Sequence, residues 1–139
     1  MIAEEAMAMP SPDINILVVD DMAAMRKILR TLLGQLGYKN VDEAEDGKQA
    51  LEILRKNPDK YGLVITDWNM PNMTGIELVQ EIRKDPNLKH LPILMVTAEA
   101  KKENVLMAIK AGVNNYIVKP FTAETLKEKL EKIFSSLQG

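Results

Sequence analysis

Several absences narrow the functions open to this sequence of 139 residues. It contains no cysteine, which excludes disulfide bonds and zinc sites built from thiolates. Its single histidine, His90, cannot form a metal site that needs several imidazoles. Zinc-dependent catalysis is therefore excluded.

The sequence also lacks a basic excess and a long apolar run. Its formal net charge of -2 argues against nucleic acid or an anionic membrane as partner, because both favour a concentrated basic face. No apolar run approaches the roughly 20 residues that span a bilayer. The N-terminal MIAEEAMAMPSP carries acids where a signal peptide carries basic residues. We expect a cytoplasmic, monomeric protein.

What is present indicates one compact domain, since 46% of the residues are hydrophobic and 27% are charged. Pro10 and Pro12 disfavour a helix near the N-terminus. We therefore predict a flexible lead-in at residues 1–12 and a single domain at residues 13–139.

The first part of this domain indicates a strand followed by a helix. The run INILVVD at 14–20 is aliphatic throughout its centre, as in strands buried on both faces. After it, apolar residues recur at helical spacing until Gly37. These residues are Met25, Ile28, Leu29, Leu32, Leu33 and Leu36.

The same order repeats four more times. Asp46 and Gln49 predict a capping box, Thr122 an N-cap, and Phe121 a hydrophobic staple onto Leu126. The further strands are predicted at 41–44, 62–67, 92–97 and 115–119. The helix after the second strand carries Leu51 and Leu54, and the helix after the third carries Leu78, Val79 and Ile82. The helix after the fourth strand carries Val105, Leu106 and Ile109, and the last helix carries Leu126, Leu130, Ile133, Phe134 and Leu137. Five alternations predict a doubly wound α/β fold, with a five-stranded parallel sheet and helices on both faces.

Polar residues follow the strands of this predicted sheet. In such sheets ligands bind outside the carboxyl ends of the strands. The first strand ends at Asp20 with Asp21 next, the third at Asp67, the fourth at Thr97 and the fifth at Lys119. These five side chains should converge on one edge of the sheet.

Clustered carboxylates need a cation, because two like charges about 4 Å apart cost on the order of 4 kcal/mol at an effective dielectric constant near 20. Lys119 and a bound Mg²⁺ are both candidates. Asp67 is then the best nucleophile for aspartyl-phosphate chemistry, with Thr97 as a hydroxyl donor. Taken singly, the aspartate pair could be an N-cap, the threonine a strand end and the lysine a solvated residue. Their joint placement favours a site.

Four segments of the chain carry a resemblance to a known family. The segments ILVVDD, VITDWNMPNMTG, LPILMVTAEAKKENV and YIVKPFTAETLKEKLEKIF resemble the receiver domain of two-component response regulators, in particular the CheY-type chemotaxis receivers. The similarity runs from about residue 15 to residue 137. It implies a flavodoxin-like fold with the strand order 2-1-3-4-5, which is already known for flavodoxin and CheY.

The resemblance implies roles for the acidic residues. Asp67 would accept a phosphoryl group from a phosphohistidine on a CheA-type histidine kinase. Asp21 and Asp67 would bind Mg²⁺ directly together with the backbone carbonyl of Asn69, and Asp20 would act mostly through water. The expected role is that of a phosphoacceptor signalling protein rather than an enzyme.

The resemblance also implies how a signal would leave the site. Lys119 and Thr97 would contact the phosphoryl oxygens, and movement of Thr97 would be coupled to an inward rotamer of Tyr116. Asn69 and Glu99 would tune hydrolysis of the acyl phosphate, although from the residues alone they could be turn and surface positions. The bond between Lys119 and Pro120 would be cis. The output face would combine the helix around 105–109, the strand at 115–119 and the last helix.

The sequence departs from the family near the site. Thr74 stands where many receivers have Asp, yet with Glu77 it still predicts a capping box. Met22 replaces an aromatic residue, and Ala23 and Ala24 replace hydroxyl residues. These changes near the acidic pair could alter Mg²⁺ affinity or access.

The output segment departs as well, because Met107, Ile109 and Val113 are bulkier than the residues of motor-binding relatives. We expect regulated binding to the flagellar motor switch protein FliM, with a CheZ-type phosphatase as a further possible partner. The alternative is a phosphate sink or a regulator of a different protein.

Two other functions are remote. A phosphatase of the haloacid dehalogenase class usually needs a second acid two residues after the nucleophile, where this chain has Asn69. A flavin binder needs a phosphate cradle, but the loop DDMAAM after the first strand is acidic.

Overall fold

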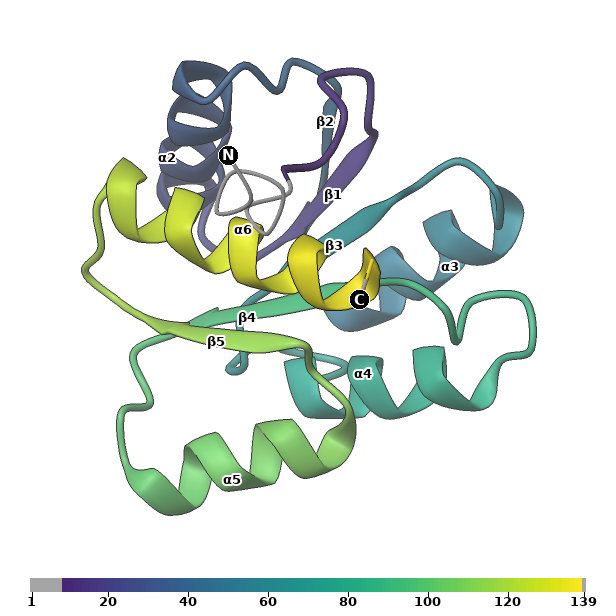
Figure 1. Cartoon of the computed structure of the whole chain (residues 1–139). Helices are drawn as coiled ribbons and strands as arrows, with labels where there is room; N and C mark the ends of the chain where they lie inside the picture. The colour runs from purple at the N-terminus through teal and green to yellow at the C-terminus, as the bar shows by residue number, and fades with distance from the viewer. Residues whose placement is uncertain (1–8, 139) are drawn as a thin grey trace.

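The structure is a computed structural model that describes residues 9–138. Strands and helices alternate along the chain (Figure 1). The strands are β1 (Ile16–Val19), β2 (Val41–Ala44), β3 (Leu63–Thr66), β4 (Ile93–Thr97) and β5 (Asn115–Val118). The helices are α2 (Ala23–Gln35), α3 (Gly47–Lys56), α4 (Gly75–Lys84), α5 (Lys102–Ala111) and α6 (Ala123–Gln138). Each strand begins and ends within two residues of its predicted position.

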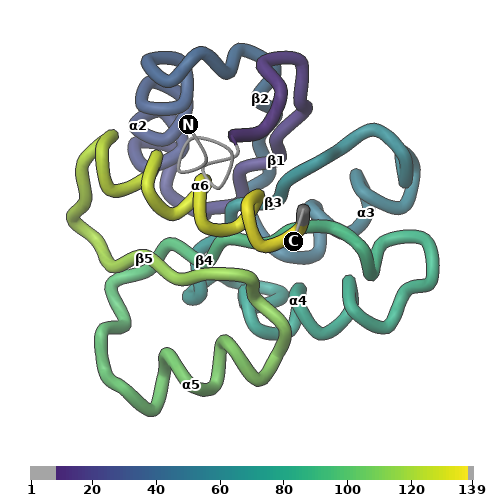
Figure 2. The backbone as a smooth tube through the Cα atoms, in the orientation of Figure 1, coloured from purple at the N-terminus to yellow at the C-terminus, as the bar shows by residue number. Residues whose placement is uncertain are grey.

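The strands form one parallel sheet in the order β2-β1-β3-β4-β5. The crossovers that join them can be followed along the backbone in Figure 2. The order reverses between β1 and β3, which are direct neighbours with Val19 opposite Thr66. This is the switch point at which such sheets bind ligands. The doubly wound α/β fold predicted from the sequence is confirmed.

The sheet separates two hydrophobic layers. Leu17 and Val19 of β1 belong to the cluster formed with α3, α4 and α5, whereas Ile16 and Val18 belong to the cluster formed with α2 and α6. Figure 1 labels the helices of both layers. All four side chains have zero exposed surface, so β1 is buried on both faces as predicted. Burying one such aliphatic side chain contributes about 1.5–3 kcal/mol.

Local sequence signals explain where α3, α4 and α6 begin. Thr74 and Glu77 form the predicted capping box of α4. The predicted box at α3 is only half formed, because Asp46 accepts from the main-chain nitrogen of Gln49 while the Gln49 side chain accepts from Glu45 instead of Asp46. The Thr122 hydroxyl accepts from the main-chain nitrogen of Thr125, as an N-cap does.

Two other local predictions were confirmed, whereas helical spacing did not identify which apolar side chains are buried. Gly37 ends the α2 segment with a φ of 101°, which glycine adopts freely. Phe121 packs against the cluster that contains Leu126, in agreement with the predicted staple. Ile28 and Leu137 follow the predicted helical spacing, but they are 47% and 52% exposed. Both lie on the outer side of their helices, where helical spacing alone does not identify the buried face.

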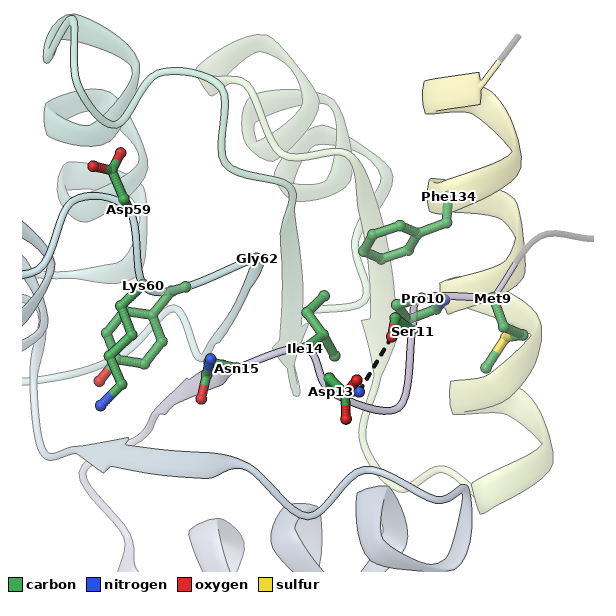
Figure 3. A pocket seen from close by; sticks show the side chains of 11 residues that line it. Met9, Pro10, Ser11, Asp13, Ile14, Asn15, Asp59, Lys60, Gly62 and Phe134 are labelled. Carbon is green, nitrogen blue, oxygen red and sulfur yellow. Dashed lines mark hydrogen bonds between the residues drawn. The ribbon is translucent and has the colours of Figure 1, made fainter.

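The predicted lead-in lies mostly outside the described residues. Within the described part, Pro10 is buried, and its carbonyl oxygen accepts a hydrogen bond of 2.8 Å from the Tyr38 hydroxyl. Nearby is a pocket of about 520 Å³ at the amino ends of β1 and β3, toward which Phe134 of α6 and Ile14 point (Figure 3). This pocket lies at the end of the sheet opposite to the predicted site.

None of the helices formed by residues 9–138 has the length and apolar character to cross a membrane.

Candidate functional site

Three carboxylates meet where β1 and β3 end. Asp20, Asp21 and Asp67 each place one carboxylate oxygen within 4.8 Å of the others. The parallel register of β1 and β3 causes this, since the main-chain nitrogen of Asp67 donates to the carbonyl of Val19 at 2.9 Å. Asp20 and Asp67 are only 1% and 8% exposed, whereas Asp21 is exposed. The cluster therefore has a buried floor and one solvent-facing member.

Lys119 supplies a positive charge to this cluster from the end of β5. Its Nζ lies 3.2 Å from Oδ2 of Asp20 and 3.3 Å from Oδ2 of Asp67. The main-chain nitrogen of Lys119 also donates to the carbonyl of Thr97, which fixes the start of the loop. The bond between Lys119 and Pro120 is cis, as the resemblance implied. One lysine thus bridges the ends of β1 and β3.

The charge of the cluster is only partly balanced. Burial raises the pKa of Asp20, and the neighbouring Asp67 adds to this effect. The hydrogen bond from the main-chain nitrogen of Met22 and the charge of Lys119 act in the opposite direction, and burial is the largest cause. Three carboxylates against one nearby ammonium leave room for further positive charge.

The donor set fits Mg²⁺. All of the converging ligand atoms are carboxylate oxygens, and the exposure of Asp21 leaves access for water, which Mg²⁺ retains when it binds proteins. Asn69, whose carbonyl is the fourth predicted ligand, is exposed and lies two residues after Asp67. The structure brings the three predicted carboxylates together, and the role of the Asn69 carbonyl stays a prediction.

Hydrogen bonds and close packing fix both the side chain and the main chain of Asp67. Its Oδ1 accepts from the main-chain nitrogen of Trp68 at 2.7 Å, and its carbonyl accepts from the Thr66 hydroxyl at 2.9 Å. Gly75, at the start of α4, is packed so closely that an added Cβ would overlap this carbonyl oxygen. Gly75 is not among the site residues predicted from the sequence, although a glycine directly after an N-cap threonine was an available signal.

Thr97, Glu99 and Tyr116 form a second group beside the cluster. Thr97 is fully buried, and its hydroxyl accepts from the main-chain nitrogen of Glu99 at 3.4 Å. The Tyr116 hydroxyl donates to the carbonyl of Glu99, and Tyr116 is 7% exposed, so its ring is turned inward. Burial raises the pKa of Tyr116 to about 12, which keeps this donor protonated at neutral pH.

The side chain of Glu99 connects this group to α5. Its Oε1 accepts from the side-chain nitrogen of Asn104 at 3.1 Å. Within residues 9–138, no hydrogen bond joins Thr97 to the three carboxylates. The tuning roles of Asn69 and Glu99 and the phosphoryl contact of Thr97 therefore stay predictions.

The predicted output face has an exposed apolar patch, which we define as Leu106, Met107, Ile109 and Val118. The exposed fractions of these side chains lie between 38% and 55%. Val113, the third of the bulky residues, is only 7% exposed and belongs to the core. It is therefore Met107 and Ile109 that reach the surface of α5.

Comparison with known proteins agrees with the geometry. Residues 16–131 match the family model of the response regulator receiver domain. The chain is 55% identical over 130 residues to chemotaxis protein CheY-3 of Vibrio cholerae, covering 94% of this chain and 98% of that protein. It is 54% identical over 125 residues to chemotaxis protein CheY of Pseudomonas aeruginosa, covering 90% of this chain and 99% of that protein.

A solved structure is similar over most of the chain. The CheX-CheY-BeF₃-Mg²⁺ complex from Borrelia burgdorferi contains a chain that superposes with a TM-score of 0.82 at 26% identity. The match covers 87% of this chain and 89% of that one. The chain therefore belongs to the response regulator receiver domain family, whose members are signalling phosphoacceptors, and it is similar to the chemotaxis proteins of that family.

Proposed function

We propose that this protein is a chemotaxis receiver that accepts a phosphoryl group on Asp67 from a CheA-type histidine kinase. The observation that carries the proposal is the contact of one lysine, Lys119, with both Asp20 and Asp67 in a chain that matches the receiver family. The Asp67 carboxylate lies 3.3 Å from the Lys119 ammonium, and a nearby cation supports a carboxylate nucleophile because it neutralises charge on the transferred group.

The transfer can be written in terms of these residues. A carboxylate oxygen of Asp67 would attack the phosphorus of the phosphohistidine. The bond between phosphorus and nitrogen would break with its electron pair left on the imidazole, and an acyl phosphate would form. Lys119 would neutralise charge on the phosphoryl oxygens, and the Thr97 hydroxyl would donate to one of them.

Mg²⁺ is the cofactor that we propose for this site. Asp20, Asp21, Asp67 and the carbonyl of Asn69 would hold it, directly or through water. When bound, it would neutralise charge that develops on the transferred group. The Borrelia relative was solved with both BeF₃ and Mg²⁺, which supports the same assignment here.

We propose that phosphorylation controls the position of Tyr116. A phosphoryl group can favour one state only through contacts that it makes in that state. Thr97 and Tyr116 are linked through the main chain of Glu99, so a shift of Thr97 toward a phosphoryl oxygen would act directly on the acceptor of the Tyr116 hydroxyl. The inward Tyr116 would be the partner-binding state.

The output that we favour is binding of the flagellar motor switch protein FliM in the cytoplasm, through α5, β5 and α6. The identity to chemotaxis proteins over most of the chain supports this partner. A phosphate sink, or regulation of another protein, is the second candidate, because Met107 and Ile109 stand on the surface of α5 and could fill a groove needed by a peptide. A CheZ-type phosphatase would act at the exposed side of the acidic cluster, near Asn69.

The phosphoacceptor assignment is tested by labelling with a phosphorylated CheA-type kinase. Asp67→Asn should lose the label and keep the fold, whereas Asp59→Asn, at the opposite end of the sheet, should be labelled like the unchanged protein. Retained label in Asp67→Asn would show that another residue accepts the phosphoryl group.

The output is tested by calorimetry with the N-terminal peptide of FliM, in the presence and absence of Mg²⁺ and beryllofluoride. Tighter binding in the activated state supports the motor-directed function. Lack of binding in both states, with Trp68 emission still reporting activation, supports the second candidate.

A further inference from the structure

Arg26 links the loop that follows β1 to strand β2. Its Nη1 donates to the carbonyl oxygen of Asp20 at 2.7 Å, and its Nε donates to Oε1 of Glu43 at 2.8 Å. Arg30 lies one turn further along α2 and donates only to the other oxygen of Glu43, at 2.8 and 3.0 Å. The Arg26 side chain is 11% exposed, whereas that of Arg30 is 46% exposed. Arg26 is thus the enclosed member of the pair and the one that reaches the acidic loop, which is formed by residues 20–22 between β1 and α2.

Two main-chain donors also hold the acidic loop: the nitrogen of Asp20 donates to the carbonyl of Ala44 at 3.1 Å, and the nitrogen of Met22 donates to Oδ1 of Asp20 at 2.9 Å. Met22 is the N-cap of α2 and provides no side-chain hydrogen bond, and neither Ala23 nor Ala24 carries a polar group. In the part of the chain from residue 9 to 138, Asp21 makes no hydrogen bond or ion pair of its own. The direction of its carboxylate therefore depends on the main chain of Asp20 and Asp21.

A purely electrostatic role for Arg26 predicts the opposite of a positioning role. A guanidinium next to the cluster repels a divalent cation, so its removal would tighten cation binding. Glu43 offsets this repulsion, because it is paired with both arginines; hydrogen bonds from Arg30 and then Arg26 lower the pKa of Glu43. With the charge offset, the role left for Arg26 is geometric: its planar guanidinium joins the carbonyl of Asp20 to the carboxylate of Glu43. A lysine ammonium cannot reproduce this geometry.

We propose that Arg26 is a positioning residue of the phosphoacceptor site, which holds the main chain of Asp20 so that Asp20 and Asp21 present their carboxylates to a divalent cation. The inference rests on the proposed Mg²⁺-dependent function of that cluster. Groups that orient metal ligands from behind commonly change metal affinity about 10–100-fold when they are replaced.

The test measures the Mg²⁺ dissociation constant from Trp68 emission, together with the free energy of unfolding in urea and EDTA. Arg26→Gln and Arg26→Lys should each weaken Mg²⁺ binding about tenfold or more. Arg30→Gln is the matched control, since it removes an ion pair to the same Glu43 without touching Asp20, and its Mg²⁺ affinity should stay within about twofold of the unchanged protein. Phosphorylation by acetyl phosphate should recover in the Arg26 variants at saturating Mg²⁺.

The outcomes separate the alternatives. Tighter Mg²⁺ binding in Arg26→Gln with unchanged binding in Arg26→Lys would show an electrostatic role and overturn the proposal. Unchanged Mg²⁺ binding with a lower free energy of unfolding in all three variants would show a purely structural role and also overturn it. If Arg26→Gln does not fold, the Mg²⁺ dissociation constant of Arg26→Lys decides between a positioning and a structural role. Absence of Mg²⁺ binding and phosphorylation in the unchanged protein would contradict the proposed function itself.

Discussion

The carboxyl edge of the sheet and the surface of α5 are built in different ways. At the edge, polar side chains are buried and paired: Asp20 and Asp67 share Lys119, and Thr97 is enclosed beside them. On α5, Leu106, Met107 and Ile109 of the exposed apolar patch face solvent, and the only buried side chain among residues 102–111 is Ala108. The edge is fixed by the strands, whereas α5 is attached through a small contact.

This difference indicates where the molecule can change at low cost. Helix α4 buries five residues and has a full capping box, whereas the N-cap of α5, Lys101, makes no side-chain hydrogen bond. Regions with few buried apolar contacts open more easily than the core. The proposed signal from this edge would therefore be expressed as a change in the position or order of α5.

The largest effect is expected at Gly75, where the edge is packed most tightly. An added methyl group would overlap the Asp67 carbonyl, so Gly75→Ala must displace the main chain that carries Asp67, the proposed phosphoacceptor. We expect a loss of about 3 kcal/mol or more in the free energy of unfolding, at the upper end for overpacking, and a strong loss of phosphorylation. Urea unfolding and labelling measure the two effects.

Gly34 provides the matched control for this substitution. It lies within α2, and an added Cβ would meet no atom within 4 Å. Gly34→Ala should raise the free energy of unfolding by about 0.5–1 kcal/mol, because alanine loses less conformational entropy in a helix. Equal effects of the two substitutions would contradict the tight packing proposed for Gly75.

Much of this arrangement could be predicted from the sequence, for identifiable reasons. Strand β1 was recognised from its aliphatic run, and the parallel sheet then required Asp20 and Asp67 to meet. The links of Arg26 to Asp20 and of Asn72 to Asp46 could not be predicted, because they join segments 6 to 26 residues apart through the details of loop conformation.

The exposure of individual apolar residues in and after the helices could not be predicted, for a similar physical reason. Ile28 and Leu137 follow helical spacing but face solvent, since spacing defines a stripe without defining its width or which side the sheet covers. The sequence leaves open which of the bulky residues of the output segment are exposed; Val113 is buried because it follows Gly112, whose φ of 117° turns the chain back into the core. Positions just beyond a helix depend on such turns.

The next effect concerns the cost of the buried charge at Asp20. Burial raises the pKa of Asp20, which means that folding disfavours its ionised form. Asp20→Asn keeps the shape and an acceptor for the nitrogen of Met22, so in EDTA we expect a gain of about 1 kcal/mol in the free energy of unfolding. Urea unfolding measures it. A less stable Asp20→Asn protein would show that the contact with Lys119 outweighs the burial cost.

With Mg²⁺ present, the unchanged protein should become more stable than Asp20→Asn. A ligand that binds only the folded protein stabilises it by about 2.7 kcal/mol at a concentration 100 times its dissociation constant. The unchanged protein should gain this stability on addition of Mg²⁺, and Asp20→Asn should gain less. The same unfolding curves, recorded with and without Mg²⁺, provide the comparison.

A smaller effect is expected at Tyr116, where the edge meets α5. The pKa of Tyr116 is about 12 in the folded protein and about 10 in the unfolded chain, so its contribution to stability is complete below pH 10 and is lost as the pH rises toward 12. Tyr116→Phe should cost about 1 kcal/mol at neutral pH and should flatten the loss of stability between these pH values. Unfolding at a series of pH values checks both effects.

Tyr38→Phe is the control for this comparison. Burial also raises the pKa of Tyr38, so its removal should likewise flatten the alkaline loss of stability. Tyr38 lies at the other end of the sheet, bonded to Pro10, and its substitution should leave binding of the FliM peptide unchanged. Loss of activated binding in both variants would contradict a specific role of Tyr116 in output.

The smallest effect on stability is expected at the α5 surface itself. Met107 and Ile109 are 51% and 55% exposed, so Met107→Ala and Ile109→Ala should change the free energy of unfolding by no more than about 0.5 kcal/mol and leave labelling of Asp67 unchanged. Their effect should appear in binding of the activated protein to the FliM peptide. Tighter binding would mean that these side chains obstruct the groove, and weaker binding that they form part of it. An effect on labelling as large as the effect on binding would contradict the separation between a rigid chemical edge and an adaptable output helix.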